Sequence, residues 1–200
     1  MQIKSDDTRW GVPAQFFHWT VLLLIIALGA LGLYMTGLPL SLWKEQVYLL
    51  HKSLGITLLG LVALRLLWRL VDPHPAPPDG LPRWQHMAAR AVHAALYLLL
   101  LAIPVSGWVF NSASGFPLRW FGLLPLPALA AASKPLAATA REIHETLFWA
   151  LVALVAVHAA AALLHHYHHR NHVLRRMLPW GHRRRDPGAA PWRPLPCSPR

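Results

Sequence analysis

The sequence predicts an all-α integral membrane protein, built as a four-helix transmembrane bundle with both termini in the cytoplasm. Composition supports this class, because 55% of the 200 residues are hydrophobic and only 14% are charged. The mean hydropathy of +0.35 is too high for a water-soluble domain of this size. The third observation is the order of the chain, in which four long apolar stretches are separated by polar or Pro-rich connectors.

Each apolar stretch is long enough to cross the hydrocarbon core of a bilayer, which takes about 20 helical residues. The first stretch is preceded by Asp6, Asp7 and Pro13 and lacks a small-residue cleavage site. It also exceeds the usual core length of a signal peptide, so we expect a retained helix. The expected spans are residues 16–37, 47–70, 87–110 and 144–166.

The connectors between these spans contain residues that interrupt helices. The first connector is the tight turn TGLPLSLW, and the second is the Pro-rich segment DPHPAPPDGLPRW. The third connector runs from Asn111 to about Arg141, and its apolar part is too short to span, so it lies on the surface or folds back as a lid. Pro104 should bend the third helix and free a carbonyl. We expect a four-helix domain over residues 1–180 and a basic, Pro/Arg-rich disordered tail over 181–200.

The charge distribution predicts the orientation in the membrane. Nineteen Lys and Arg against eight Asp and Glu give a net charge of +11. A basic chain can indicate nucleic-acid binding, but these charges lie beside the apolar stretches in the positive-inside pattern, so we expect membrane lipid and no nucleic acid as a partner. Most basic residues flank one side, which we assign to the cytoplasm together with both termini. The opposite side carries Lys44, Arg119, Lys134 and Arg141.

Histidine is the residue type that points to function. The chain has 13 histidines and one cysteine, which excludes an intramolecular disulfide framework, a cysteine-ligated zinc finger and a cysteine-held iron–sulfur cluster. A histidine inside a bilayer needs a polar partner or a ligand. Every apolar stretch has at least one, namely His18, His51, His93, His144 and His158.

The spacing of His144 and His158 is the most informative of these. Fourteen residues of helix return to within roughly 40° of the same direction and separate the two rings by about 21 Å along the axis. Both rings therefore face one side at two depths, and one metal cannot bind both. This geometry suits a helix that supplies one axial ligand to each of two haems stacked across the membrane.

Depth and direction suggest the partner of each ring. His51 lies about 6 Å below the start of the second stretch, at a depth similar to that of His144, so these two are candidates for an outer haem. His18, near the cytoplasmic start of the first stretch, lies at a depth similar to that of His158, and these two are candidates for an inner haem. His93 competes with His18 for the inner role, and spacing alone leaves both open.

Other residues fit this arrangement but also have plain structural interpretations. Any single histidine could simply form a hydrogen bond across the bundle. Arg65 lies fourteen residues after His51 and thus on the same face, where it could pair with a propionate of the inner haem or a quinone oxygen, or only reach to the interface. Gly29, Gly32 and Gly55 allow the approach of either a haem edge or a neighbouring helix.

A second group of histidines lies in the run HHYHHRNH. His165, His168, His169 and His172 recur at three- and four-residue intervals on one helical face, a spacing that can bind zinc or copper. The alternative is a wet, cationic helix end that satisfies the last carbonyls, and we favour it. His165 and His166 are also candidates for a position near a quinone.

With these residues in view, the chain resembles the prokaryotic cytochrome b561 family, part of a larger group of di-haem membrane cytochromes. The resemblance covers roughly residues 9–180, and its motifs are specific when taken together. They are FHW around His18, HKSLGI from His51, LRLLWRL from Leu64, HAALYLLLLAIPVSGW from His93, HET from His144, VHAAAALLHHY from Val157 and LRRMLP ending at Pro179.

The resemblance implies a four-helix bundle of the bacterial inner membrane that binds two b haems through paired histidines. It implies that His18 and His158 hold the inner haem, that His51 and His144 hold the outer haem, and that His93 is a non-ligand near haem or quinone. Members of the family exchange electrons with ubiquinone, and a superoxide oxidase activity at the periplasmic face is associated with them. The resemblance also implies a homodimer.

We therefore predict a di-haem cytochrome b that oxidises superoxide at the periplasmic face and reduces ubiquinone, with the basic residues of that face attracting the anion. Two other functions stay open. A quinone-linked anchor subunit would carry electrons for a soluble redox partner, with residues 181–200 as the candidate docking element. A metal-handling membrane protein would instead use the stripe from His165 to His172.

Overall fold

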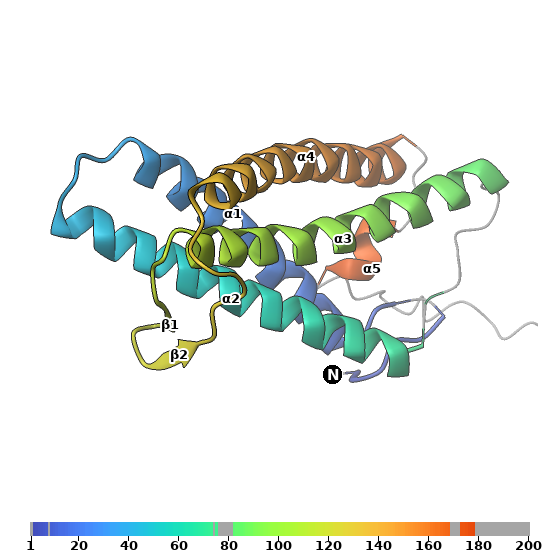
Figure 1. The fold of residues 1–200 in the computed structure, drawn as a ribbon. Coiled ribbons are helices and arrows are strands. Elements are labelled where there is room, and N and C mark those ends of the chain that lie inside the picture. The colour runs from blue at the N-terminus through green and yellow to red at the C-terminus, as the bar shows by residue number, and fades with distance from the viewer. Residues whose placement is uncertain (1, 8, 74, 76–81, 169–172, 179–200) are drawn as a thin grey trace, which may run out of the picture.

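The computed structural model describes the chain except for residues 1, 8, 74, 76–81, 169–172 and 179–200. Figure 1 shows the long helices running roughly lengthwise beside one another, with a small β-hairpin next to one of them. We call the end where this hairpin lies the hairpin end, and the end where the N-terminal segment meets α5 the terminal end. The elements are α1 (Val12–Thr36), α2 (Leu42–Val71), α3 (Arg83–Ala113), β1 (Leu118–Trp120), β2 (Leu124–Leu126), α4 (Lys134–Tyr167) and α5 (Val173–Met177).

The four long helices confirm the predicted number of membrane spans. Helices α1 to α4 have 25, 30, 31 and 34 residues, and each is long and apolar enough to cross a membrane. Helix α3 packs along α4, α1 packs along α2, and α2 also contacts α3. Each of these helices contributes to one apolar core, while many of their large apolar side chains face outward, as expected of helices in lipid. The buried core residues are Val21, Leu58, Val62, Leu100 and Leu151.

Helix α4 begins at Lys134, ten residues before the expected residue 144, so that the last part of the third connector is helical. The Ser133 side chain caps the helix by accepting a hydrogen bond from the backbone N–H of Leu136 (3.5 Å). Pro135 stands in the first turn, where its missing N–H is not needed. Pro135 lies within the segment that we expected to be a connector, but it marks the start of a helix. Helices α1, α2 and α3 also begin four or five residues before their expected spans.

The third connector folds back onto α2, which is one of the two arrangements that the sequence left open. Its strands pair antiparallel, with Leu118 opposite Leu126. At the turn, the backbone N–H of Phe121 donates to the Ser53 hydroxyl of α2 (2.9 Å). The indole N–H of Trp120 donates to the Thr57 hydroxyl (3.0 Å), so two side chains of α2 hold the hairpin. This hairpin is absent from the sequence prediction.

The Ser53 contact also supports an unfavourable backbone conformation. Phe121 and Gly122 both have a positive φ, of 48° and 73°. That region is costly for a phenylalanine and free for a glycine. Ser53 has only 1% of its surface exposed, so its bond to the Phe121 backbone is shielded from water. The fully buried hydroxyl thus stabilises a turn that the sequence of the hairpin alone would favour weakly.

The terminal end is closed by polar contacts between distant parts of the chain. Asp72, the C-cap of α2, is buried and accepts two hydrogen bonds from Ser5, one from the backbone N–H (2.8 Å) and one from the hydroxyl (2.6 Å). The backbone N–H of Gly11 donates to the same Ser5 hydroxyl (2.9 Å). A side chain at Gly11 would overlap the carbonyl of Ile3, so only glycine fits there. These bonds attach the N-terminal segment to the end of α2.

Helix α5 packs against the same segment. The backbone N–H of Trp10 donates to the carbonyl of Arg176 (3.3 Å), and the indole N–H of Trp19 donates to the carbonyl of Met177 (2.9 Å). The start of α1 and α5 therefore lie at one end of the bundle, as Figure 1 also shows. The side of the membrane that this end faces stays a prediction. The tail over 181–200 lies outside the described residues.

We expect Asp72→Ala to lower the free energy of unfolding by about 2–3 kcal/mol, because it leaves the buried Ser5 donors without an acceptor. Thermal unfolding of the detergent-purified protein measures this. Asp7→Ala is the matched control, since Asp7 is an exposed carboxylate on the same segment. Equal stability of the two variants would contradict the role of Asp72.

Candidate functional site

The first histidine pair lies towards the hairpin end. His51 comes from α2 and His144 from α4, and their ring centroids are 6.4 Å apart with an angle of 76° between the planes. Both side chains are half-buried. The two rings therefore face each other across the bundle at one depth, and we call them the hairpin-end pair.

Helix α3 orients the ring of His144. Its Nδ1 atom lies 2.9 Å from the backbone carbonyl of Ile103 and 3.2 Å from the hydroxyl of Ser106. A carbonyl can only accept, so Nδ1 carries the proton and Nε2 is left with its lone pair, the form in which histidine binds a metal. Gly107 allows this close approach, because a Cβ there would be 3.0 Å from the His144 ring. Backbone anchoring of this kind is typical of ligand histidines.

The ring of His51 is held less tightly. It lies near the backbone of Leu28, but its buried Nδ1 atom makes no hydrogen bond of acceptable geometry with any described residue. Gly32 of α1 lies beside the ring, where a Cβ would be 3.4 Å from it. A Cβ at Gly55, one turn further along α2, would meet no atom within 4 Å, so open space lies next to this histidine.

The second pair lies towards the terminal end. His18 of α1 and His158 of α4 also have centroids 6.4 Å apart, with an interplanar angle of 61°. We call them the terminal-end pair. The Arg65 guanidinium of α2 donates to Nδ1 of His18 (3.3 Å), so this ring carries its proton on Nε2. Arg65 also stacks over the ring of Tyr97 at 5.5 Å.

His93 is close to the terminal-end pair, as the sequence suggested, but its geometry differs. Its centroid lies 5.3 Å from that of His158, and its side chain is exposed. Two imidazoles on opposite faces of one metal have centroids on the order of 6 Å apart, because each metal–nitrogen bond is about 2.0 Å long. All three contacts are edge-to-face, but the spacing of 6.4 Å in the other two pairs fits such a metal, whereas 5.3 Å between His93 and His158 is shorter than it requires. The geometry therefore favours His18 as the partner of His158.

The sequence analysis did not single out the polar residues that follow His51 in α2. Lys52 and Ser53 directly follow His51 in the motif HKSLGI, and a lysine inside an apolar span was a visible signal. Lys52 donates to the side-chain carbonyl of Asn111 on α3 (3.1 Å). The Asn111 amide in turn donates to the backbone carbonyl of Phe116 (2.8 Å). Lys52 and Asn111 are 59 residues apart in the sequence, so no local sequence pattern could reveal their contact.

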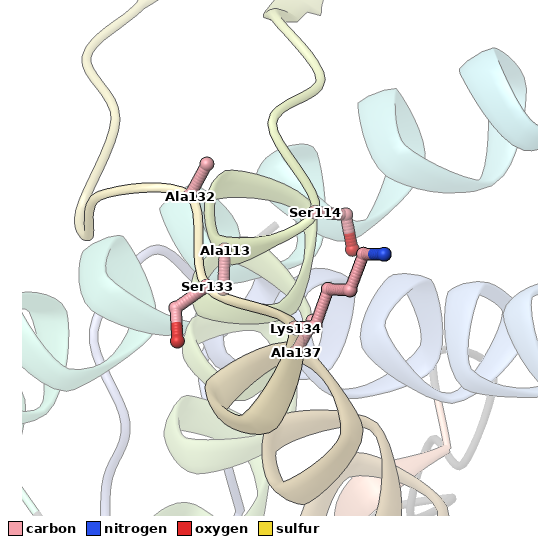
Figure 2. A pocket seen from close by; sticks show the side chains of 6 residues that line it. All are labelled: Ala113, Ser114, Ala132, Ser133, Lys134 and Ala137. Carbon is pink, nitrogen blue, oxygen red and sulfur yellow. The ribbon is translucent and has the colours of Figure 1, made fainter.

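Two surface hollows lie near the ends of the bundle. The first, with a volume of about 560 Å³, lies where α3 ends and α4 begins (Figure 2). Lys134 and two serine hydroxyls give it polar edges. The second, of about 320 Å³, is an apolar groove between α1 and α2 at the level of His18 and Arg65. The first is lined by Ala113, Ser114, Ala132, Ser133, Lys134 and Ala137, and the second by Phe17, Leu64, Leu67, Trp68 and Val71.

The histidine stripe at the end of α4 falls partly on residues that the structure does not describe. His165 and His166 lie in the last turn of α4 and His168 follows it, but His169 and His172 lie outside the described residues. Within the described residues, no group of three or more His, Cys, Asp or Glu side chains could hold a metal ion. The interpretation of the stripe as a metal site stays a prediction.

Comparison with known proteins agrees with the fold. A family model described as prokaryotic cytochrome b561 matches residues 9–180. The chain is 37% identical to the Escherichia coli (strain K12) protein "Cytochrome b561 homolog 2" over 89% of its own length and 95% of that protein. It is 33% identical to "Cytochrome b561 homolog 1" of the same organism, over 86% of this chain and 97% of the relative. It is also 33% identical to the Yersinia pestis protein "Probable superoxide oxidase CybB", over 81% of this chain and 91% of the relative.

The family match extends over all four long helices and both histidine pairs. A membrane protein that binds haem is consistent with the four helices able to span a membrane and with the 6.4 Å spacing of the rings in each pair. The chain therefore belongs to the prokaryotic cytochrome b561 family, whose members are b-haem-binding, electron-transferring multi-pass proteins of the bacterial inner membrane.

Proposed function

We propose that this protein binds two b haems, one at each histidine pair, and uses them to carry electrons from superoxide at the periplasmic face to ubiquinone. The observation that carries the proposal is the presence of two facing pairs with the same centroid distance of 6.4 Å. When both axial positions of an iron are filled by histidine, the haem supplies one-electron transfer through its edge and leaves no site for oxygen on the metal. The protein supplies position, potential and access.

In this proposal the chain needs His51 and His144 at the periplasmic haem and His18 and His158 at the cytoplasmic one. Ile103 and Ser106 keep the lone pair of His144 directed away from α3. Binding of a metal at Nε2 of His18 would move the ring proton to Nδ1, which then no longer accepts from Arg65. The released guanidinium would be available for a haem carboxylate or a quinone oxygen.

Superoxide fits the charge of the hairpin end. Lys44, Arg119, Lys134 and Arg141 all lie in elements at this end of the bundle, and an excess of positive charge attracts a small anion. Arg141 contributes less than the others, because it pairs with Glu145 (2.9 Å). A relative of this chain, from Yersinia pestis, is named a probable superoxide oxidase. In the balanced reaction, two superoxide anions lose one electron each to give dioxygen, and ubiquinone takes up two electrons and two protons to give ubiquinol.

Ubiquinone fits the terminal end. The apolar groove between α1 and α2 has the chemistry to hold an isoprenoid chain, and it lies on the same stretch of α2 as Arg65. We place the quinone head near Arg65 and His158. The homodimer that the family resemblance implied stays a prediction.

The haem assignment predicts the haem content of histidine variants. The unaltered protein should hold about two b haems per chain, and each single change His18→Ala, His51→Ala, His144→Ala and His158→Ala should remove about one. His93→Ala is the control, because the 5.3 Å between its ring and that of His158 is shorter than a shared metal requires. A pyridine haemochrome assay with reduced-minus-oxidised spectra measures this. Loss of a haem in His93→Ala but not in His18→Ala would exchange the two roles, and an unaltered protein without haem would refute the proposal.

The close approach at Gly107 gives a second test at the hairpin-end pair. Gly107→Val places a side chain where the His144 ring lies, so the variant should lose the periplasmic haem and keep the other. Gly60→Val is the matched control, since it adds the same β-branched residue to a helix where a Cβ meets no atom within 4 Å. The haem content of the two variants is compared. A full haem complement in Gly107→Val would contradict the ring position.

The redox function is tested with purified protein in detergent that receives a steady flux of superoxide and a soluble ubiquinone analogue. We expect ubiquinol to form with no other protein present. Arg65→Gln should raise the KM for the quinone several-fold and leave the superoxide dependence unchanged, because Arg65 lies at the other end of the bundle. Quinone reduction only after addition of a soluble redox protein would instead favour the anchor-subunit function.

A further inference from the structure

Lys52 is a positive charge inside a membrane-spanning helix that the proposed function does not use. Its side chain is half-buried in α2, next to His51, and its ammonium donates to the Asn111 side chain (3.1 Å). Asn111 is 6% exposed and is itself fixed by its bond to the Phe116 carbonyl (2.8 Å). The lysine is thus held in one place rather than extended to the interface, which is unusual for this residue type.

The charge of Lys52 is not cancelled locally. Its recorded partner is a neutral amide, and the ion pair found among the described residues, Arg141 with Glu145, lies elsewhere. A charged side chain within a membrane span is costly, so its retention there suggests a role. A tether to the third connector alone would not need a charge, because a neutral donor of similar length could reach the same amide.

Lys52 is linked to both helices that hold the hairpin-end pair in place: to α2 by its position after His51, and to α3 by its bond to Asn111. It follows His51 in α2, and its partner Asn111 lies one turn of α3 beyond Gly107, which contacts the His144 ring. One turn of helix is about 5.4 Å. The bond to Asn111 therefore holds the ammonium about one turn of α3 away from the point where Gly107 meets the His144 ring, on the side towards the hairpin end.

We propose that Lys52 is a positioning residue that fixes a positive charge beside the hairpin-end pair and thereby raises the reduction potential of the haem held there. The inference rests on the proposed haem binding at His51 and His144. Reduction of an iron adds one negative charge to the site, and a fixed positive charge favours that state. A higher potential makes this haem a better acceptor for an electron that arrives from the hairpin end.

The test is a redox titration of the full-length protein in detergent, with the haem content determined in parallel. Lys52→Met keeps the length of the side chain and removes the charge, and Lys52→Arg keeps the charge. We expect Lys52→Met to lower the reduction equilibrium constant of one haem about tenfold, the size expected for unit charges about 10 Å apart in protein. For a one-electron couple this is a shift of about 59 mV to lower potential.

Three controls make the result specific. His51→Ala removes the haem of the hairpin-end pair and so identifies which step of the titration belongs to it. Lys44→Met removes a positive charge in the first turn of the same helix, where Lys44 donates to the Leu38 carbonyl (2.7 Å), and should leave both steps unchanged. Lys52→Arg should titrate like the unaltered protein.

A shift confined to the step assigned by His51→Ala supports the proposal. Loss of that haem alone in Lys52→Met, with retention in Lys52→Arg, also supports it, because the charge is then required for the haem to bind. Two unchanged steps, or equal effects of Lys52→Met and Lys52→Arg, would overturn it and leave Lys52 as a tether of the connector. Absence of haem from the unaltered protein would overturn the proposed function and this inference together.

Discussion

The structure depends on helix α4, which contributes one ring to each of the two histidine pairs. An imidazole in the hydrocarbon core needs a polar partner or a metal, since lipid offers neither. Because His144 and His158 lie on one face of α4, about 21 Å apart along its axis, they require partners at two depths on the helices that this face meets. Helix α2 supplies His51 at one depth and α1 supplies His18 at the other. The short turn over residues 37–41 makes α1 and α2 antiparallel, and this places their two histidines, each near the start of its helix, at these two depths.

Hydrogen bonds to polar side chains attach the connecting segments to the helices at both ends of the bundle. At the hairpin end, Ser53 holds the turn of the β1–β2 hairpin and Lys52 holds Asn111, so the residues that follow His51 fix the third connector. At the terminal end, Asp72 binds Ser5 and so joins the N-terminal segment to α2. At each end a buried side chain, Ser53 or Asp72, accepts the hydrogen bond, and without its donor that acceptor would be left unsatisfied in the interior. The connectors are therefore part of the structure around the rings.

Much of the helical fold follows from the sequence, because span length and helical periodicity are local properties. The pairing of His144 with His51 could be inferred in the same way, from rise per residue and chain direction. The early start of α4 could not be inferred, since a proline is common both in a connector and in the first turn of a helix. The hydrogen bond from the Leu136 backbone to the Ser133 cap, which only the structure shows, distinguishes the two cases. The hairpin and the bonds of Lys52 and Asp72 were also missed. They join residues 59 to 68 positions apart, and no periodic pattern encodes such contacts.

The two histidine pairs are not equally prepared for a metal. Nδ1 of His144 already donates to the Ile103 carbonyl, so its Nε2 is free, and metal binding requires no change of tautomer. His18 instead accepts from Arg65 at Nδ1, so a metal at Nε2 has to displace both the ring proton and the arginine contact. Arg65 is retained near the site by Tyr97, over whose ring it stacks. Under the proposed haem binding, the arginine that contacts His18 in this structure would be released for an anionic group when His18 binds the metal, and haem binding at this end would then be coupled to the availability of a cation.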